Sequence, residues 1–279
     1  MELIHDKQEK LTSLIKSMDS VAVAFSGGVD STFLLASCHD ALSHKAVAVT
    51  GRSLSFPERE LRAATEFTSQ RGITHLFVDS EELELPGFSD NPPNRCYLCK
   101  RELFIKIRNA AKSKGITNVI EASNKDDEGD YRPGMIAINE LGIGSPLREA
   151  GLTKAEIRQL SKEMNLSTWD KPSFACLASR FPYGERITPQ ELAKLDSAEE
   201  YLLSLGFKQV RVRIHDKGRL ARIESDEEGF LLLRDQDLRN SIHQKFKEIG
   251  FDFSAFDLMG YRTGSMNVTL PEEISLKRP

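Results

Sequence analysis

Short apolar runs rich in β-branched residues alternate with stretches of helical periodicity over the first 170 residues. The runs predicted to be buried strands lie at 20–25, 45–51, 74–79 and 117–123. Between them, helices are predicted at 30–42, 57–71 and 96–114. Nearly continuous apolar strands separated by helices are typical of a parallel sheet covered on both faces, joined by right-handed crossovers. The pattern therefore predicts a doubly wound α/β fold.

The pattern changes after a further predicted helix at 153–165, which opens with the capping box Thr153-x-x-Glu156. Residues 170–186 are rich in Pro, Ser and aromatic residues and show no period, as in a linker or an active-site loop. A smaller α+β pattern follows, with helices at 188–205 and 234–249, a hairpin at 209–224 and a strand at 251–259. We therefore expect two domains, 1–186 and 187–279.

Composition narrows the class of protein. With 39% hydrophobic and 29% charged residues, the 279-residue chain should form packed domains. It shows neither a secretory signal nor an apolar run long enough to span a membrane. Four cysteines without a signal favour a cytoplasmic protein and disfavour a structural disulfide. A net charge of −4 argues against a nucleic-acid partner, although a local basic face is compatible with it.

The segment AFSGGVDST, residues 24–32, carries the strongest chemical signal. A buried strand enters a loop with two adjacent glycines, and a helix starts at once, so backbone N–H groups can face an anion. We expect this cradle to use Ser26, Gly27, Gly28, Asp30 and Ser31. No lysine follows the glycines, so the loop differs from the GxxxxGK[ST] type. Asp30 in a phosphate cradle argues for a bridging Mg²⁺; a simple tight turn is the alternative.

A second polar loop, EASNKDDEGDYRPG at 121–134, follows the fourth predicted strand. In an α/β sheet, ligands lie beyond the carboxyl ends of the strands, so this loop should face the first one. We expect Ser123, Asn124 and Asp127 to hold nucleotide or Mg²⁺, and Asp130 or Arg132 to engage phosphate or substrate. The alternative is an ordinary polar surface loop, because Asn, Asp and Gly are turn residues.

The loop SGGVDS at 26–31 resembles the SGGxDS motif of the N-type ATP pyrophosphatases. The resemblance implies an adenine nucleotide alpha hydrolase-like fold that cleaves ATP to AMP and pyrophosphate and adenylates its substrate. It also implies that Thr50, with Gly51 and Arg52 after the second strand, lies by the adenosine.

Three further segments, DYRPG (130–134), CLASRFPYG (176–184) and VRVR (210–213), make most of the chain resemble the LarE family. The resemblance implies an enzyme that adenylates a carboxylate of a pyridinium mononucleotide and replaces its oxygen with sulfur. The product becomes the nickel-pincer cofactor of lactate racemase. A homo-oligomer and a downstream nickel-inserting enzyme are implied as partners, and Cys176, Asp30 and Arg180 as catalytic residues.

The cysteines separate two varieties of that family. In one, the residue matching Cys176 donates its own sulfur. In the other, which Cys96 and Cys99 resemble, three thiolates hold a [4Fe-4S] cluster whose fourth iron binds an extra sulfide. From the residues alone, zinc with an open position and a redox or persulfide relay remain alternatives. Cys38, in an apolar helix, is expected to be a buried small hydrophobe.

Arg211 and Arg213 alternate with apolar residues, so both should lie on one strand face. Arginine is suited to bidentate phosphate contacts. The family resemblance suggests that this strand meets a nucleotide phosphate or a subunit interface, with Glu199 and Glu224 nearby. A solvated strand face with ion pairs is the alternative.

Three other functions compete with the sulfur transferase. A cluster-dependent tRNA thiolase also combines SGGxDS with Cys-x-x-Cys, but the acidic pI and the FPYG and DYRPG segments disfavour it. An amide synthetase that uses ammonia leaves the three cysteines unexplained. A nucleotide-binding sensor without catalysis would release no pyrophosphate.

Overall fold

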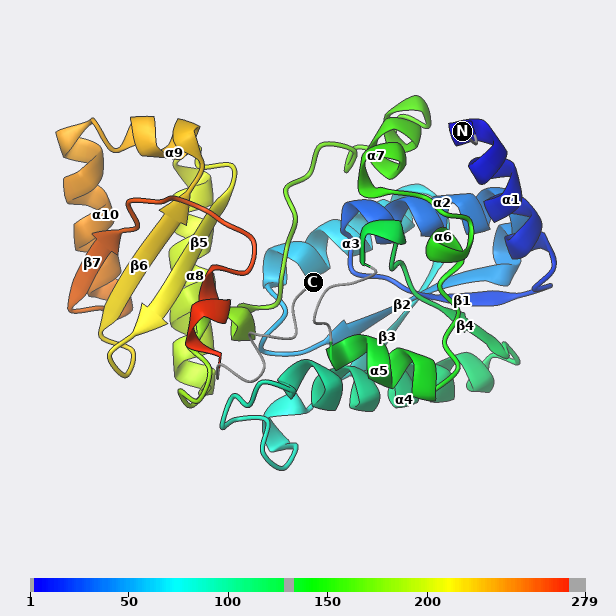
Figure 1. Cartoon of the computed structure of the whole chain (residues 1–279), viewed down its shortest axis with the longest axis horizontal. Helices are drawn as coiled ribbons and strands as arrows, with labels where there is room; N and C mark the ends of the chain where they lie inside the picture. Colours follow the sequence, from blue (N-terminus) through cyan, green and yellow to red (C-terminus); the bar gives the residue numbers. More distant parts are fainter. Residues whose placement is uncertain (1–2, 128–132, 271–279) are drawn as a thin grey trace.

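The computed structural model describes residues 3–127 and 133–270 and contains two separate sheets (Figure 1). The larger is parallel, with strand order β3-β2-β1-β4. Its strands are β1 (Val21–Ala24), β2 (Ala46–Arg52), β3 (Thr74–Asp79) and β4 (Asn118–Ile120). The predicted α/β class with a parallel sheet is confirmed.

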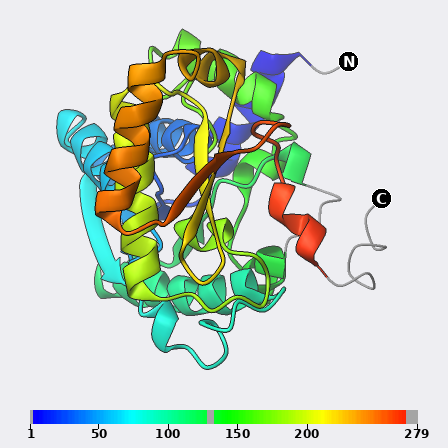
Figure 2. The same ribbon diagram turned by 90° about the vertical axis from the view of Figure 1, so that its left-hand side faces the viewer.

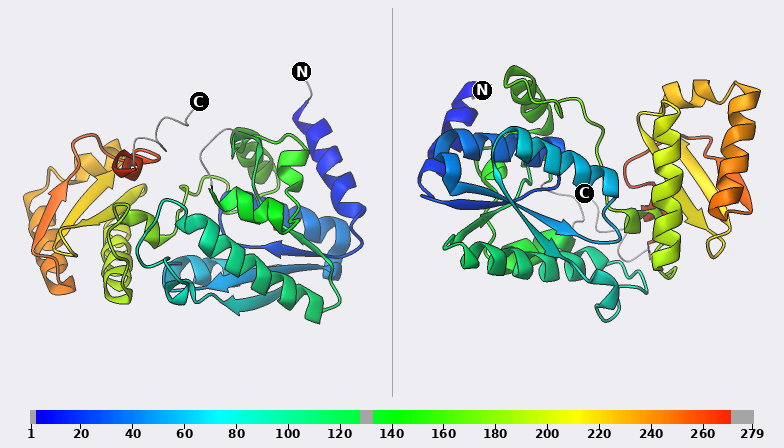
Figure 3. Two further views of the ribbon diagram at one scale, coloured as in Figure 1. Left: turned by 60° about the horizontal axis from the view of Figure 1, so that its bottom comes forward. Right: turned by 180° about the vertical axis from the view of Figure 1, so that it is seen from behind.

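Successive residues of the central strands point to opposite layers of helices. Val21 and Val23 pack into one apolar cluster, whereas Ala22 packs into another. The first layer comprises α1 (Ile4–Lys16), α2 (Val29–Leu42), α3 (Glu58–Gln70), α6 (Pro146–Glu149) and α7 (Lys154–Glu163). The second comprises α4 (Arg95–Ser113) and α5 (Pro133–Glu140), on the opposite face (Figure 3). Cys38 lies fully buried in the first cluster, as predicted.

The strand predicted at 74–79 is present, but the prediction that it is buried is wrong. The run 74–79 was expected to be buried, but β3 is the edge strand, and both Thr74 and Asp79 are exposed. Its apolar residues are only half-buried because no strand lies beyond it in the described sheet. A short apolar run cannot by itself distinguish an edge strand from a central one.

The smaller sheet contains β5 (Val210–His215), β6 (Leu220–Ser225) and β7 (Phe253–Phe256). The predicted hairpin is confirmed, because β5 and β6 are antiparallel and Asp216, Lys217 and Gly218 all have positive φ in the turn. β7 joins β6 in parallel. Helices α8 (Pro189–Ser204) and α10 (Gln236–Ile249) pack on this sheet, and α9 (Glu227–Leu232) follows β6 (Figure 2).

The segment between the two sheets contributes to the second core. Leu177 and Phe181 pack with Phe207 and Phe246 in the apolar cluster of the smaller sheet. An ion pair between Arg59 of α3 and Asp196 of α8, at 2.9 Å, also joins the two parts. The domain boundary placed at 186 and 187 stays a prediction.

The larger sheet has a switch point beside β1. The chain leaves β1 towards β2 on one side, and β4 later pairs with β1 on the other. The loops after β1 and β4 therefore diverge at the carboxyl edge, which is where open α/β sheets bind ligands. Among the described helices, none has the length and apolar character needed to cross a membrane.

Candidate functional site

The SGGVDS loop connects β1 directly to α2, whose N-cap is Gly28. Gly27 has a φ of +68°, and a Cβ there would lie 3.3 Å from the Ala64 side chain of α3. The hydroxyls of Ser26 and Ser31 are 3.1 Å apart, and the Ser31 hydroxyl donates to the Gly28 carbonyl. The loop is thus fixed in shape by its own hydrogen bonds at the N-terminus of α2, the end of a helix that favours anions.

Asp30, in the first turn of α2, forms an ion pair that the sequence did not reveal. Its Oδ2 lies 2.5 Å from Nζ of Lys154, the first residue of α7. Its Oδ1 is buried and has no hydrogen-bond partner among the described residues. Burial raises the pKa of Asp30, and Lys154 opposes that effect. Asp127 lies close enough to raise this pKa further.

Lys171 also reaches the SGGVDS loop at 26–31, hereafter called the phosphate loop after its predicted role, from the irregular segment after α7. Its ammonium donates to the Gly27 carbonyl at 3.0 Å and to the carboxylate of Glu60, a buried residue of α3, at 2.6 Å. Arg158 of α7 donates to the carbonyls of Trp169 and Lys171 and so holds this segment. These contacts fix the segment that leads to Cys176 against the SGGVDS loop.

The loop after β4 is organised around Glu121, a buried carboxylate. The Ser123 hydroxyl lies 2.7 Å from one of its oxygens, and the Ser145 hydroxyl contacts the other. Ser123, predicted to touch nucleotide, therefore has a partner inside the protein. The Asn124 N–H donates to Asp127 at 2.9 Å. The predicted residues Asp130 and Arg132 lie outside the described residues.

Thr50 lies on β2 with its hydroxyl inside the protein rather than at the edge. It donates to the Phe25 carbonyl at 2.6 Å and lies 2.7 Å from Nε2 of His75. Nδ1 of His75 in turn lies 3.0 Å from the Thr68 hydroxyl. Thr50, which was expected beside the adenosine, thus connects the backbone just before Ser26 to the neighbouring strand and to α3.

The three candidate metal-binding cysteines come from two segments. Cys96 and Cys99 lie three residues apart in the first turns of α4, and Cys176 precedes the short 3-10 helix Leu177–Arg180. All three are half-buried and form no disulfide. Burial raises the pKa of Cys99, and Cys176 and Cys96 raise it further. The pKa of Cys176 is raised by burial and then by Cys96. These mutual effects indicate that the three thiols lie near one another, and Cys99 and Cys176 both pack against the apolar cluster of the smaller sheet.

Within residues 3–127 and 133–270, no three His, Cys, Asp or Glu side chains are arranged to hold a single metal ion. A zinc site made by the three cysteines therefore gains no support. A [4Fe-4S] cluster places a different iron at each thiolate, so its ligands need not reach one common ion. The donor set of three cysteines in one neighbourhood is compatible with such a cluster.

Arg180, predicted to be catalytic, is fully buried, and its guanidinium is occupied by protein groups. Nε and Nη2 donate to the two carboxylate oxygens of Glu199, both at 2.9 Å. Nη1 donates to the carbonyls of Ala175 and Cys176. These contacts hold the backbone at Cys176, and the catalytic role of Arg180 stays a prediction.

Arg211 and Arg213 share one face of β5, as expected, but that face is buried rather than solvated. Arg213 pairs with Glu224 at 2.7 Å and also donates to the Ser179 carbonyl. Arg211 donates to the carbonyls of Val210 and Ser173. Burial, followed by the charge of Arg180, lowers the pKa of Arg211 to about 10. Glu199 offsets part of this effect, so Arg211 is an incompletely compensated cation close to the Cys176 segment.

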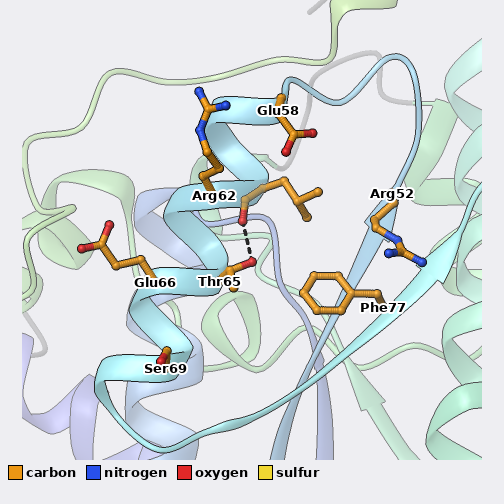
Figure 4. Close-up of a pocket in the computed structure, with 8 residues that line it drawn as sticks. Arg52, Glu58, Arg62, Thr65, Glu66, Ser69 and Phe77 are labelled. Carbon is orange, nitrogen blue, oxygen red and sulfur yellow. Dashed lines mark hydrogen bonds between the residues drawn. The ribbon is translucent and has the colours of Figure 1, made fainter.

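Two open pockets lie at the edge of the larger sheet. One, of about 440 Å³, is formed by α3, by Arg52 at the end of β2 and by Phe77 of β3 (Figure 4). The other, of about 330 Å³, shares Arg52 and extends to Leu54 and Phe56. Neither is lined by the phosphate loop, and the ring of Phe77 faces α3. These pockets adjoin the stretch predicted to lie by the adenosine.

Comparison with known proteins decides the family. The chain is 35% identical to the pyridinium-3,5-bisthiocarboxylic acid mononucleotide synthase of Lactiplantibacillus plantarum, over 97% of both chains. The chain belongs to the LarE family. It is also 40% identical to an uncharacterised protein of Synechocystis, over 96% of this chain and 99% of that one. An uncharacterised Methanocaldococcus jannaschii protein is 25% identical over 87% of this chain and 91% of its own length. No protein-family model matches the sequence.

The sequence analysis of this LarE family member did not identify two lysines that contact the phosphate loop, Lys154 and Lys171. Lys171 lies in an aperiodic segment, and nothing in the sequence indicated where its side chain points. Lys154 carried a signal, because it directly follows the cap Thr153 and so opens a helix. A cation at a helix N-terminus is unfavourable unless a carboxylate faces it. That carboxylate is Asp30.

Proposed function

We propose that this protein is an ATP-dependent sulfur transferase. It adenylates a carboxylate of a pyridinium-biscarboxylate mononucleotide, releases pyrophosphate and converts the carboxylate to a thiocarboxylate. The observation that carries the proposal is the relationship, over nearly the whole chain, to a protein named as the synthase of a pyridinium bisthiocarboxylate mononucleotide. The same chain joins an SGGVDS loop to a neighbourhood of three cysteines, which suits adenylation followed by sulfur transfer.

The phosphate loop is proposed to bind the pyrophosphate portion of ATP. Its support is the N-terminus of α2, the two serine hydroxyls and the positive φ of Gly27. Asp30 is proposed to hold Mg²⁺, with Asp127 close by. The orphaned, buried Oδ1 of Asp30 supports this assignment. Mg²⁺ is usually held by one or two carboxylates together with substrate phosphates, so no larger cluster of acidic residues is needed.

Cys96, Cys99 and Cys176 are proposed to hold a [4Fe-4S] cluster. Burial and mutual repulsion raise the pKa values of Cys99 and Cys176, so a set of thiolates here needs a cation beside it. When bound, the cluster would offer a sulfide on its open iron as the sulfur source. Arg180 would then keep Cys176 in place through the backbone carbonyl.

Arg211 is proposed to meet the phosphate of the substrate nucleotide. It is a buried cation whose described side-chain hydrogen bonds go to backbone carbonyls, so an anionic partner would compensate its charge. From its family we also propose that the protein acts as a homo-oligomer and passes its product to a nickel-inserting enzyme.

Adenylation is tested by measuring pyrophosphate release with ATP and the pyridinium biscarboxylate mononucleotide. We expect release by the wild type and almost none by Ser26→Ala or Asp30→Ala, because the cradle and its metal ligand are lost. Cys38→Ala, a change in the buried core away from the loop, is the control and should retain release. Normal release by both loop variants would sink the assignment.

Iron content tests the sulfur source. Protein reconstituted without oxygen should contain about four irons per chain and absorb near ~400 nm. The variants Cys96→Ser, Cys99→Ser and Cys176→Ser should lose this iron, whereas Cys38→Ala should retain it. Absence of iron, together with conversion of Cys176 to dehydroalanine after turnover, would instead establish self-sacrificing transfer. Salt-sensitive binding of transfer RNA would favour a tRNA thiolase.

A further inference from the structure

Lys154 lies across the switch point of the larger sheet. Its ammonium is 2.5 Å from Asp30, which belongs to the phosphate-loop side. Its backbone N–H donates to Asp126 at 2.8 Å, on the loop that follows β4. One residue therefore contacts both sides of the crevice where an α/β sheet binds its ligand.

The ammonium of Lys154 has donors to spare. A lysine offers three N–H donors, and in the described part of the chain Asp30 is the one side-chain partner of this ammonium. Its side chain is 31% exposed, so a ligand can reach it. Lys171 and Arg158, the other cations near the loop, already donate to backbone carbonyls or to Glu60. Of these three cations, Lys154 donates to the fewest protein acceptors, so its charged group is the one best able to take a new anionic partner.

The carboxylate that faces Lys154 is itself poorly placed for a phosphate chain. Asp30 is largely buried, and without a cation its charge would repel an incoming polyphosphate. The SGGVDS loop contains no lysine that could offset this repulsion. Mg²⁺ held by Asp30 would offset part of it, and the positive charge of Lys154, supplied from α7, would offset more.

We propose that Lys154 is a phosphate-binding residue that contacts the pyrophosphate portion of ATP. This inference rests on the proposed adenylation. When the substrate carboxylate oxygen bonds to the α-phosphorus, the bond from that phosphorus to the bridging oxygen breaks, and its electron pair leaves with pyrophosphate. Lys154 keeps its proton and donates a hydrogen bond to that leaving group, where negative charge increases.

Binding of inorganic pyrophosphate, measured by titration calorimetry with a chelator present, tests the contact without turnover. Lys154→Met should weaken binding about 10- to 100-fold, as expected for the loss of a charge-assisted hydrogen bond. Lys154→Arg should retain most of the affinity. Binding of AMP should change little in either variant.

Lys7→Met is a matched control. Lys7 forms an ion pair at 2.7 Å with Glu156, which lies on the same helix α7 as Lys154. Both side chains of this pair are partly buried, as are those of Lys154 and Asp30. Loss of that pair should leave pyrophosphate affinity unchanged. An equal loss of affinity in Lys7→Met would mean that loosening α7, rather than a phosphate contact, explains the effect, and it would overturn the inference.

A double-mutant cycle distinguishes a direct contact between Lys154 and pyrophosphate from a role in which Lys154 only neutralises the charge of Asp30. If Lys154 touches pyrophosphate, Lys154→Met should still weaken binding when Asp30 is already Asn. If Lys154 only offsets Asp30, the second substitution should have no effect, and the inference fails. Wild-type protein that binds neither pyrophosphate nor ATP, with Mg²⁺ present as well as with chelator, would overturn the proposed function as well. Tight wild-type binding that Lys154→Met leaves intact overturns this inference alone.

Discussion

Arg180 and Glu199 form a doubly hydrogen-bonded ion pair with exposed fractions of 0% and 1%. The same carboxylate accepts from Arg59 of α3 and from the Val212 N–H of β5. Glu199 therefore connects the larger sheet's helix layer, the smaller sheet and, through Arg180, the backbone at Cys176. Contacts of this kind, between residues far apart along the chain, hold the candidate site together.

Glu199→Ala should lower the free energy of unfolding by about 3–5 kcal/mol, because it leaves a buried arginine without its partner. Glu200→Ala is a matched control on the next residue of α8. Glu200 pairs with Arg62 at 2.8 Å, but both side chains are more than half exposed, so its loss should cost less than about 1 kcal/mol. Urea unfolding of the two variants measures the difference; equal values would contradict the assigned role.

Acid should weaken the same connection. Burial alone would raise the pKa of Glu199, but Arg180, Arg211 and Arg59 together lower it to about 2 from an ordinary 4.5. The stabilisation is thus fully present above about pH 4.5 and is lost as the pH falls towards 2. Glu199→Gln should flatten the stability profile in that window. A wild-type profile already flat between pH 4.5 and 2 would refute this reasoning.

Gly27→Ala should destabilise the protein and weaken pyrophosphate binding, because φ is +68° and the new Cβ would lie 3.3 Å from Ala64. The left-handed conformation alone costs about 1–2 kcal/mol for a residue with a Cβ. Gly28→Ala is the comparison, since Gly28 has a φ of −80°. Thermal unfolding should show the larger loss for Gly27→Ala, and a reversed order would argue against the described loop.

His75 should be neutral at pH 6, because burial lowers its pKa to about 4. The Thr50 hydroxyl donates to the Phe25 carbonyl, so it must accept from Nε2–H of His75. Nitrogen NMR should show His75 as the tautomer with its proton on Nε2. The signal is assigned by its absence from the spectrum of His75→Gln. Stability should fall as the pH drops from about 6.5 to 4, because only the unfolded chain gains the proton readily. A protonated His75 at pH 6 would contradict this.

Lys171→Met should loosen the segment that leads to Cys176, because the contacts with Gly27 and Glu60 are lost. In metal-free protein, we expect Cys176 to be alkylated faster in Lys171→Met than in the wild type. Peptide mass spectrometry measures the rate. Lys162→Met is the control, since Lys162 lies over the Trp169 ring but does not reach the phosphate loop. Equal alkylation rates in the wild type and Lys171→Met would show that the segment is held by other contacts.

Local pattern was enough for most of the fold. Apolar periodicity predicted the strands and the main helices, and the cap Thr153 predicted the start of α7, because these features depend on neighbours within a few residues. The pattern could not show that β3 lies at the edge of the sheet, since strand order depends on how distant segments pair.

The site divides in the same way. The sequence by itself determined that a glycine turn and a helix N-terminus form a cradle at Ser26–Ser31, because backbone geometry there follows from the residues present. Only the tertiary structure decided that Lys154 faces Asp30, that Arg180 is occupied by Glu199, and that Cys176 joins Cys96 and Cys99. Such contacts join residues far apart along the chain, and burial sets their energies, which no local pattern encodes.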